Sequence, residues 1–253
     1  MGSDDDYVPA PLRRLWRIPE TSRLGRPAAL DVNQVVAAAV EIADREGLGG
    51  VTLPRVGKNL GFTGMSLYRH VGSKDELLTL MADAALGEPP SIDSRDWREG
   101  LRTWAYAQRE VFRRRPWLTR VPVSGPPAGP HQVAWMEAAL KVLSGTHLDW
   151  GAKMGILLLV SGYVAQSVRQ SGELAEGRAE GQGQVEAERA YGRALERLVE
   201  PGRFPQTAQM FSSGLFEASP PDTSDTAASD ADFAFGLELI LDGVAGRVER
   251  SDA

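Results

Sequence analysis

The sequence predicts an all-α protein, and three observations carry this prediction. Apolar residues recur every three or four positions along most of the chain, which is the spacing of one face of an α-helix. Alternation of apolar and polar residues, the pattern of a strand, does not occur over any credible length. Capping residues, glycines and prolines divide the pattern into segments. Helices that pack on one another are therefore the expected architecture.

The first group of helices is expected between residues 31 and 88, and each has its own start signal. Asp31 precedes a helix that stops at Gly47, and Thr52 precedes one that ends at Gly61. Thr63 then begins a helix that contains Leu67 and Tyr68. Ser73, with Glu76 three residues later, predicts a capping box at the start of the next helix. Pro89 and Pro90 close the group.

The second group of helices is longer. Helices are expected over 96–114, 131–143, 150–172, 184–199 and 232–249, with at most one short helix within 201–216. The 150–172 segment is apolar on nearly every side, which predicts burial on more than one face. Residues 217–230 are rich in Ser, Asp, Ala and Pro and are expected to be mobile. The predicted division is an arm over 1–30, one domain over 31–90 and another over 91–253.

Composition narrows the function classes. The 253 residues include no cysteine, which excludes disulfides, thiolate metal sites and cysteine nucleophiles. The net charge is −6, but the segment from Arg13 to Arg26 holds five arginines and one acid, so we expect a flexible basic arm on an acidic body. Neither a signal peptide nor an apolar run of membrane-spanning length is seen, the most hydrophobic run being 156–160. A cytoplasmic protein is expected.

The helix, turn and helix over 52–71, followed by a support helix, have the order that places one helix in the DNA major groove. Exposed hydroxyl, guanidinium, imidazole and ammonium groups there can bond phosphates or base edges. The alternative is a set of solvated polar residues on a small helical bundle. The predicted DNA-binding residues are Arg26, Thr52, Arg55, Thr63, Gly64, Met65, Ser66, Tyr68, Arg69, His70 and Lys74.

This stretch resembles the DNA-binding domain of the TetR (tetracycline-repressor) family of bacterial regulators. The residues that carry the resemblance are 38–47, Leu60-Gly61, 67–71 and 74–78. Residues 135–140 and 233–244 are similar to the C-terminal domain of the tetracycline-repressor type, so the resemblance covers roughly 30–250.

The resemblance implies roles for particular residues. Tyr68 and Lys74 match positions that contact phosphates, and Thr63, Met65 and Ser66 match the base-facing side of the recognition helix. Leu24-Gly25-Arg26-Pro27 resembles an element that lays an arginine in a minor groove. Pro54 and Gly64 depart from the pattern, because base-reading side chains occupy these positions in the tetracycline repressor.

For the C-terminal domain the resemblance implies an effector pocket and a dimer interface. Aromatic, apolar and amide side chains of the helices at 96–114, 131–143 and 150–172, and of the residues just after the first of them, are the expected pocket: Trp104, Gln108, Phe112, Trp117, Trp135, Met136, Met154, Leu158 and Gln166. The last helix, with that at 150–172, is expected to form a four-helix bundle with a second copy through Phe235, Gly236, Leu239, Ile240, Gly243 and Val244. His131 is expected to be a helix-start residue, and no metal or cofactor is expected.

The prediction is a homodimeric repressor that binds double-stranded, palindromic operator DNA and is released by a small, largely apolar effector. A regulator without a small effector and an activator stay open as alternatives. A helical enzyme is disfavoured because phosphate loops, nucleophile elbows and clusters with metal-ligand spacing are lacking.

Overall fold

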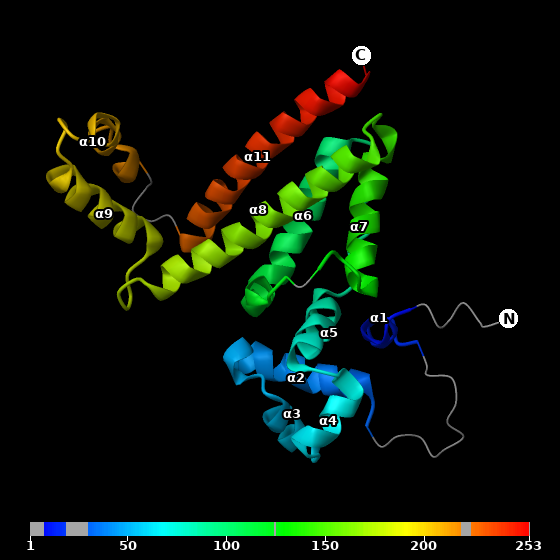
Figure 1. The fold of residues 1–253 in the computed structure, drawn as a ribbon. Coiled ribbons are helices and arrows are strands. Elements are labelled where there is room, and N and C mark those ends of the chain that lie inside the picture. The colour runs from blue at the N-terminus through cyan, green and yellow to red at the C-terminus, as the bar shows by residue number, and fades with distance from the viewer. Residues whose placement is uncertain (1–7, 19–29, 124, 219–223, 253) are drawn as a thin grey trace, which may run out of the picture. The chain divides into compact units, whose positions relative to one another are not determined.

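The computed structural model describes residues 8–18, 30–123, 125–218 and 224–252. Within these ranges the fold is all-α and contains no strand, as predicted (Figure 1). The helices are α1 (Ala10–Leu15), α2 (Val32–Glu46), α3 (Leu53–Leu60), α4 (Gly64–Val71), α5 (Lys74–Leu86), α6 (Trp97–Arg114), α7 (Pro130–Val142), α8 (Trp150–Glu176), α9 (Gln184–Leu198), α10 (Pro205–Phe211) and α11 (Asp225–Asp252).

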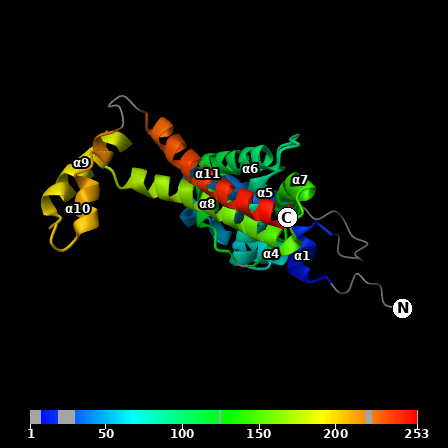
Figure 2. The same ribbon diagram turned by 90° about the horizontal axis from the view of Figure 1, so that it is seen from above.

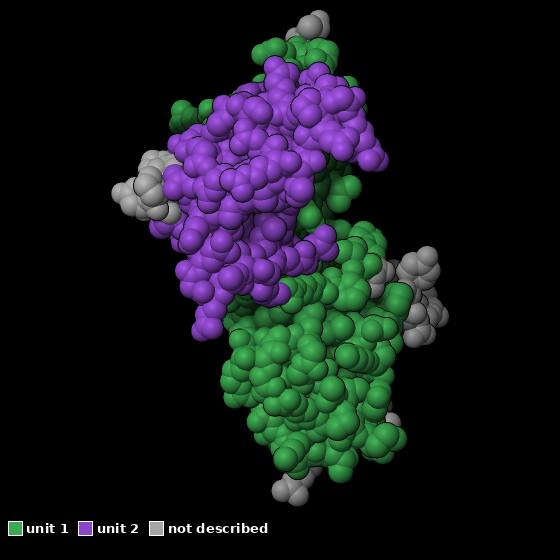
Figure 3. Space-filling view, turned by 90° about the vertical axis from the view of Figure 1, so that its left-hand side faces the viewer, with its two compact units in different colours: residues 1–168, 245–253 green, residues 169–244 purple. Residues whose placement is uncertain are grey.

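The chain divides into two compact units, which Figure 3 colours separately. The first contains residues 1–168 and 245–253, and the second contains residues 169–244. The boundary expected near residue 90 lies inside the first unit, between α5 and α6. Helices α2 to α5 and helices α6 and α7 therefore belong to one contact unit.

Helices α2 to α5 enclose an apolar core that includes Val35, Ile42, Val56, Leu67 and Leu77. The predicted caps explain where these helices begin. Asp31 and Gln34 form a reciprocal capping box at α2, and the Thr52 hydroxyl accepts a hydrogen bond from the Arg55 N–H, 3.4 Å away. Ser73 accepts from the Glu76 N–H at 3.0 Å. The capping box expected there is not completed, because the Glu76 carboxylate pairs with Arg14 instead.

Residues 10–15 form helix α1, although the whole segment 1–30 was expected to be a flexible arm. Leu15 is buried in the core of the N-terminal helices and Leu12 packs against it. The Arg14 Nη2 donates to Glu76 Oε2 at 2.9 Å, which ties α1 to the first turn of α5. Two leucines and one ion pair thus order a segment that has too few apolar residues to fold alone.

Helices α6 and α7 pack through tryptophans. The Trp104 and Trp135 rings meet edge to face with centroids 6.2 Å apart, and the Trp104 indole N–H donates to the Trp135 carbonyl at 3.0 Å. Gly100 permits the close approach, because a Cβ there would lie 2.6 Å from a Val142 methyl. This buried aromatic pair fixes α6 against α7.

In the second unit, α9 and α10 lie side by side (Figures 1 and 2). Tyr191, Phe211 and Phe216 form a ring cluster with centroid separations of 5.3 to 5.7 Å. Helix α11 begins at Asp225 rather than near residue 232, so residues 225–230 are helical although they were expected to be mobile. The Asp225 carboxylate accepts from the Gln184 N–H at 2.7 Å and pairs with Arg178, which anchors this helix start.

Among the described helices, α8 is long and apolar enough to cross a membrane, judged by length and composition only. The continuous apolar runs in the sequence had indicated no such segment. The difference arises because a mean hydropathy over a long window tolerates the polar residues that interrupt a continuous apolar run in α8. A single helix of this kind also occurs in proteins that do not enter membranes, where other helices or a second subunit cover it.

Candidate functional site

The turn between α3 and α4 is set by three glycines. Gly61 takes a left-handed conformation, with φ of 76°, and ends α3 as predicted. A Cβ at Gly57 would lie 2.8 Å from the Phe62 carbonyl oxygen, and one at Gly64 would lie 3.1 Å from the Pro54 backbone. Glycine at these two points therefore allows the two helices to approach each other this closely.

This packing also accounts for the two departures from the family pattern. Gly64 faces the backbone of Pro54, so a larger side chain at position 64 would push the start of α4 away from α3. Pro54 occupies the first turn of α3, where its missing N–H leaves no helical hydrogen bond unmade. Pro54 and Gly64 therefore form one close contact between two helix N-termini.

The outer face of α4 is the candidate reading surface. Leu67 and Val71 are fully buried, which turns the opposite side of the helix to solvent. Met65 is 78% exposed and Tyr68 is 47% exposed, and Arg69 is exposed as well. The Ser66 hydroxyl donates to the Thr63 carbonyl at 2.7 Å, whereas the Thr63 side chain makes no capping bond although a cap was expected.

Candidate phosphate ligands flank this surface. Thr52 and Lys74 are exposed at the starts of α3 and α5, and His70 is half-buried in the last turn of α4. The Arg55 guanidinium is paired with Glu46, with Nη2 2.6 Å from the carboxylate, so a DNA contact by Arg55 would compete with this ion pair. Arg26 lies outside the described residues.

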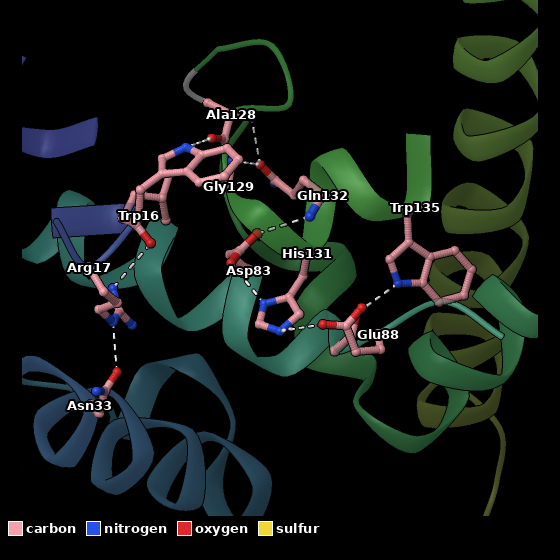
Figure 4. A network of polar contacts seen from close by, with 12 residues as sticks. Trp16, Arg17, Asn33, Asp83, Glu88, Ala128, Gly129, His131, Gln132 and Trp135 are labelled. Atoms are coloured by element: carbon pink, nitrogen blue, oxygen red, sulfur yellow. Dashed lines mark hydrogen bonds and ion pairs between the residues drawn. The ribbon is translucent and has the colours of Figure 1, made fainter. Parts of the chain in front are cut away.

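Sequence reasoning missed a junction between α5 and the start of α7, which Figure 4 shows. The Asp83 carboxylate is 4% exposed. It accepts a hydrogen bond from the Gln132 N–H at 3.0 Å and lies 3.0 Å from His131 Nδ1. Asp83 thus supplies a cap to the N-terminus of a helix in the other predicted domain. The available signal was an acid on the otherwise apolar inner face of α5.

The residues that follow α1 join the same junction (Figure 4). The Trp16 indole N–H donates to the Ala128 carbonyl at 2.8 Å, and Arg17 Nε donates to Asn33 in α2 at 2.7 Å. Burial lowers the pKa of the Arg17 guanidinium, and the negative charge of Asp83 opposes that shift. The segment therefore bridges α2, α5 and the loop before α7.

A second junction joins α6 to α2 and α5. Arg115, at the end of α6, donates from Nη1 to the Ala85 carbonyl at 2.9 Å. Its Nε lies 3.3 Å from the Asp44 carboxylate, which also accepts from the Trp117 indole N–H at 2.7 Å. Trp117 was expected in the effector pocket, but it lies in the core of the N-terminal helices. Its large ring fills the space beneath α2 and α5 instead.

The remaining residues of the expected effector pocket fall into three groups. Trp104, Gln108 and Trp135 are buried, and Phe112 and Met136 are half-buried. The Gln108 Oε1 has no hydrogen-bond partner among the described residues. Met154, Leu158 and Gln166 are exposed on α8 of the single chain, and Leu158 is 76% exposed.

A hollow of about 420 Å³ lies between the C-terminal ends of α2, α5 and α6. Asp44, Glu88, Arg114 and Arg115 give it a charged lining. It shares no residue with the expected effector set. It is therefore a different place from the apolar pocket that the sequence predicted.

The expected dimer residues of α11 are partly exposed and partly buried. Phe235, Leu239 and Gly243, spaced four residues apart, are exposed on one strip of the helix. Gly236 and Ile240 are half-buried beside it, and Val244 is buried. On α8, Met154, Gly155, Leu158, Leu159 and Gly162 are exposed. Each of the two helices thus presents an apolar or small-residue strip to solvent.

Metal chemistry has no visible basis in the described ranges. They contain no group of three or more histidine, cysteine or acidic side chains that could hold a metal ion. His131 lies in the first turn of α7, as expected, and its Nδ1 faces Asp83 rather than an open ligand position. These residues hold two helices together.

Comparisons with known proteins agree with this geometry. Residues 35–81 match the bacterial regulatory proteins of the tetR family, and residues 89–248 match the tetracyclin repressor-like C-terminal domain. The HTH-type transcriptional repressor DrrR1 of Streptomyces coeruleorubidus is 34% identical over 250 residues, which cover 96% of this chain and 87% of that protein. The tetracycline repressor protein class A from transposon 1721 of Escherichia coli is 28% identical over 223 residues, which cover 86% of this chain and 92% of that repressor.

Among solved structures, the TetR family protein ActR of Streptomyces coelicolor, in complex with actinorhodin, has the same fold. Its TM-score is 0.69 at 25% identity, and the match covers 87% of this chain and 98% of ActR. The first family match ends at residue 81, within α5, and the second begins at residue 89, in the segment before α6. The chain belongs to the TetR family of bacterial transcriptional regulators.

Proposed function

We propose that the chain is a DNA-binding transcriptional repressor that a small, largely apolar effector releases from its operator. The observation that carries the proposal is the outer face of α4. Buried Leu67 and Val71 hold this helix so that Met65, Tyr68 and Arg69 project from a rigid core. A short, well-supported helix with exposed contact residues is what insertion into a major groove requires.

The two junctions support a response of this surface to the body. Helix α5 supports the DNA-reading helices, and its last turns are held by Arg115 from the end of α6 and by the N-terminus of α7 through Asp83. A tilt of α6 or α7 would therefore move α5. An effector needs only to prefer the tilted state by a few kcal/mol to empty the operator.

The effector is proposed to lie beside Trp104 and Gln108 of α6. Trp104 lies one helical turn before Gln108 and is buried edge to face against Trp135, and the Gln108 Oε1 is a buried acceptor without a hydrogen-bond donor among the described residues. An unpaired buried acceptor costs about 1–3 kcal/mol, which a donor group on a ligand would recover. The effector class that fits is a flat, largely apolar molecule with at least one hydrogen-bond donor.

The strips on α8 and α11 are the proposed dimer surfaces. Leu158 and Phe235 are large apolar side chains that a monomer would leave in water. Two copies are needed to place two α4 helices in successive major grooves, so the expected operator is palindromic. The proposed location is the cytoplasm, where a DNA-binding regulator meets its operator.

DNA binding is tested first, because the rest of the proposal depends on it. The full chain is used to select duplexes from a random pool, and the selected duplex is titrated by gel shift with wild type and with Tyr68→Ala. Enrichment of an inverted repeat and weaker binding by the variant are expected. Failure to enrich any sequence would refute the DNA-binding function.

The test for an effector uses the same selected duplex. A library of apolar aromatic compounds with hydrogen-bond donors is screened for release of the DNA, and each hit is repeated with Gln108→Met. Release that requires a higher concentration with this variant supports the proposed site. A library that never changes DNA affinity would favour the alternative of a regulator without a small effector.

A further inference from the structure

The first turn of α4 offers few polar groups for reading bases. Gly64 has no side chain and cannot acquire one without moving the backbone of Pro54, 3.1 Å from the position of a Cβ. The Ser66 hydroxyl already donates to the Thr63 carbonyl. Of these two positions, which face DNA in a helix of this kind, Gly64 therefore offers no side chain and Ser66 offers a hydroxyl that is already hydrogen-bonded.

Met65 lies between these two residues and is the most exposed large apolar side chain of α3, α4 and α5. It is the second residue of α4, and the N-terminal residues of a recognition helix are the ones that reach base edges. A methionine side chain carries no hydrogen-bond donor and only a weak acceptor. It therefore cannot read the hydrogen-bonding groups of a base strongly.

The major groove presents one apolar group among its base edges, the C5 methyl of thymine. We propose that Met65 determines operator specificity by packing against the C5 methyl of one thymine in each half-site. This inference rests on the proposed DNA-binding function and goes beyond it by naming a base and the residue that selects it. The long, adaptable methionine side chain suits a contact of this kind.

The experiment removes the methyl group from DNA without changing base pairing. The operator selected from a random pool is resynthesised with deoxyuridine in place of thymidine, one symmetric pair of positions at a time. Wild type, Met65→Ala and a control, Met210→Ala, are titrated against each duplex. Met210 is an exposed methionine of α10 and has no place in the proposed DNA contact.

Substitution of deoxyuridine for thymidine at one pair of positions should weaken wild-type binding about fourfold for each half-site, or about sixteenfold for both. This is the affinity equivalent of the roughly 0.8 kcal/mol gained when one methylene-sized group is buried. Met65→Ala should bind the thymidine duplex more weakly and lose sensitivity at that pair alone, whereas Met210→Ala should keep it. An unchanged thermal melting point would show that Met65→Ala is folded.

Two results would overturn the inference while leaving the DNA-binding function intact. One is wild-type affinity that no deoxyuridine substitution changes. The other is a Met65→Ala variant that keeps the wild-type pattern of sensitivity. Failure to select any duplex would instead count against the proposed function itself.

Discussion

Replacing Gly129 with alanine should loosen the junction between α5 and α7. The backbone at Gly129 has φ of −80° and ψ of 156°, which suits alanine, so steric conflict is the reason for the effect. An added Cβ would lie 2.0 Å from Asp83 Oδ1 and 2.3 Å from its Cγ. The Asp83 side chain would have to leave the position in which it caps α7.

The magnitude follows from the bonds that would be lost. Asp83 accepts from the Gln132 N–H at 3.0 Å and lies 3.0 Å from His131 Nδ1. A hydrogen bond to a charged group is worth about 1.5–3 kcal/mol, and partial rearrangement recovers some of it, so we expect a loss of about 3 kcal/mol. For a chain of this size that lowers the melting temperature by about 6–12 °C.

Differential scanning calorimetry of Gly129→Ala beside Gly125→Ala provides the assay. Gly125 lies in the same loop, and a Cβ there would meet nothing within 4 Å, so its variant controls for the loss of chain flexibility. Equal melting temperatures for the two variants would refute the argument that Asp83 is a structural cap.

Three further predictions concern other parts of the molecule. Leu239→Lys should shift the protein toward monomer in analytical ultracentrifugation, whereas Leu198→Lys, at a more exposed leucine of α9, should not; a dimer in both would contradict the proposed surface. Gly57→Ala should lower stability by about 2 kcal/mol in urea titrations, because its Cβ would lie 2.8 Å from the Phe62 carbonyl oxygen, and unaltered stability would show that the turn can relax. Hydrogen bonds hold the pKa of Asp225 below its ordinary value, so the stability that it contributes is present above that value and is lost as the pH falls through the lowered one. On acidification below the ordinary pKa of an aspartate, helical ellipticity should therefore fall more in wild type than in Asp225→Asn, and identical curves would contradict the role of Asp225.

Local signals in the sequence were sufficient to predict most helices and the α3–turn–α4 element. The N-caps Asp31, Thr52 and Ser73 each act within three residues of the chain, and Gly61 needs only its own φ angle. These features do not depend on distant partners. That is why residue types and spacing were enough to predict where α2, α3 and α5 begin.

Features that depend on distant residues were not predictable in this way. Helix α1 is ordered by Glu76, 62 residues away from Arg14. The capping box expected at Ser73 fails for the same reason, since the Glu76 carboxylate can serve only one of its two possible partners well. Trp117 was predicted to line the pocket from its residue type, but its indole N–H donates a hydrogen bond to Asp44, 73 residues away.

The candidate reading surface shows both cases together. Its location followed from sequence, but the reason for Gly64 did not, because the close approach to Pro54 exists only once α3 and α4 are packed. Pro54 and Gly64, the two positions without base-reading side chains, pack against each other in one close contact. The consequence is that specificity must rest on the other residues in the first turns of α4, and Met65 is the most exposed large apolar side chain among them.

The chemistry of the two junctions bears on how the DNA-reading helices could switch. Both junctions are made by directional polar contacts, Asp83 with the α7 N-terminus and Arg115 with the Ala85 carbonyl. Hydrogen bonds weaken steeply once their angle falls below about 120°, so these contacts are either made or lost. Packed apolar contacts already resist continuous deformation, and these polar contacts add a directional restraint on α5. Polar junctions give α5 discrete positions, and discrete positions are what an effector can select.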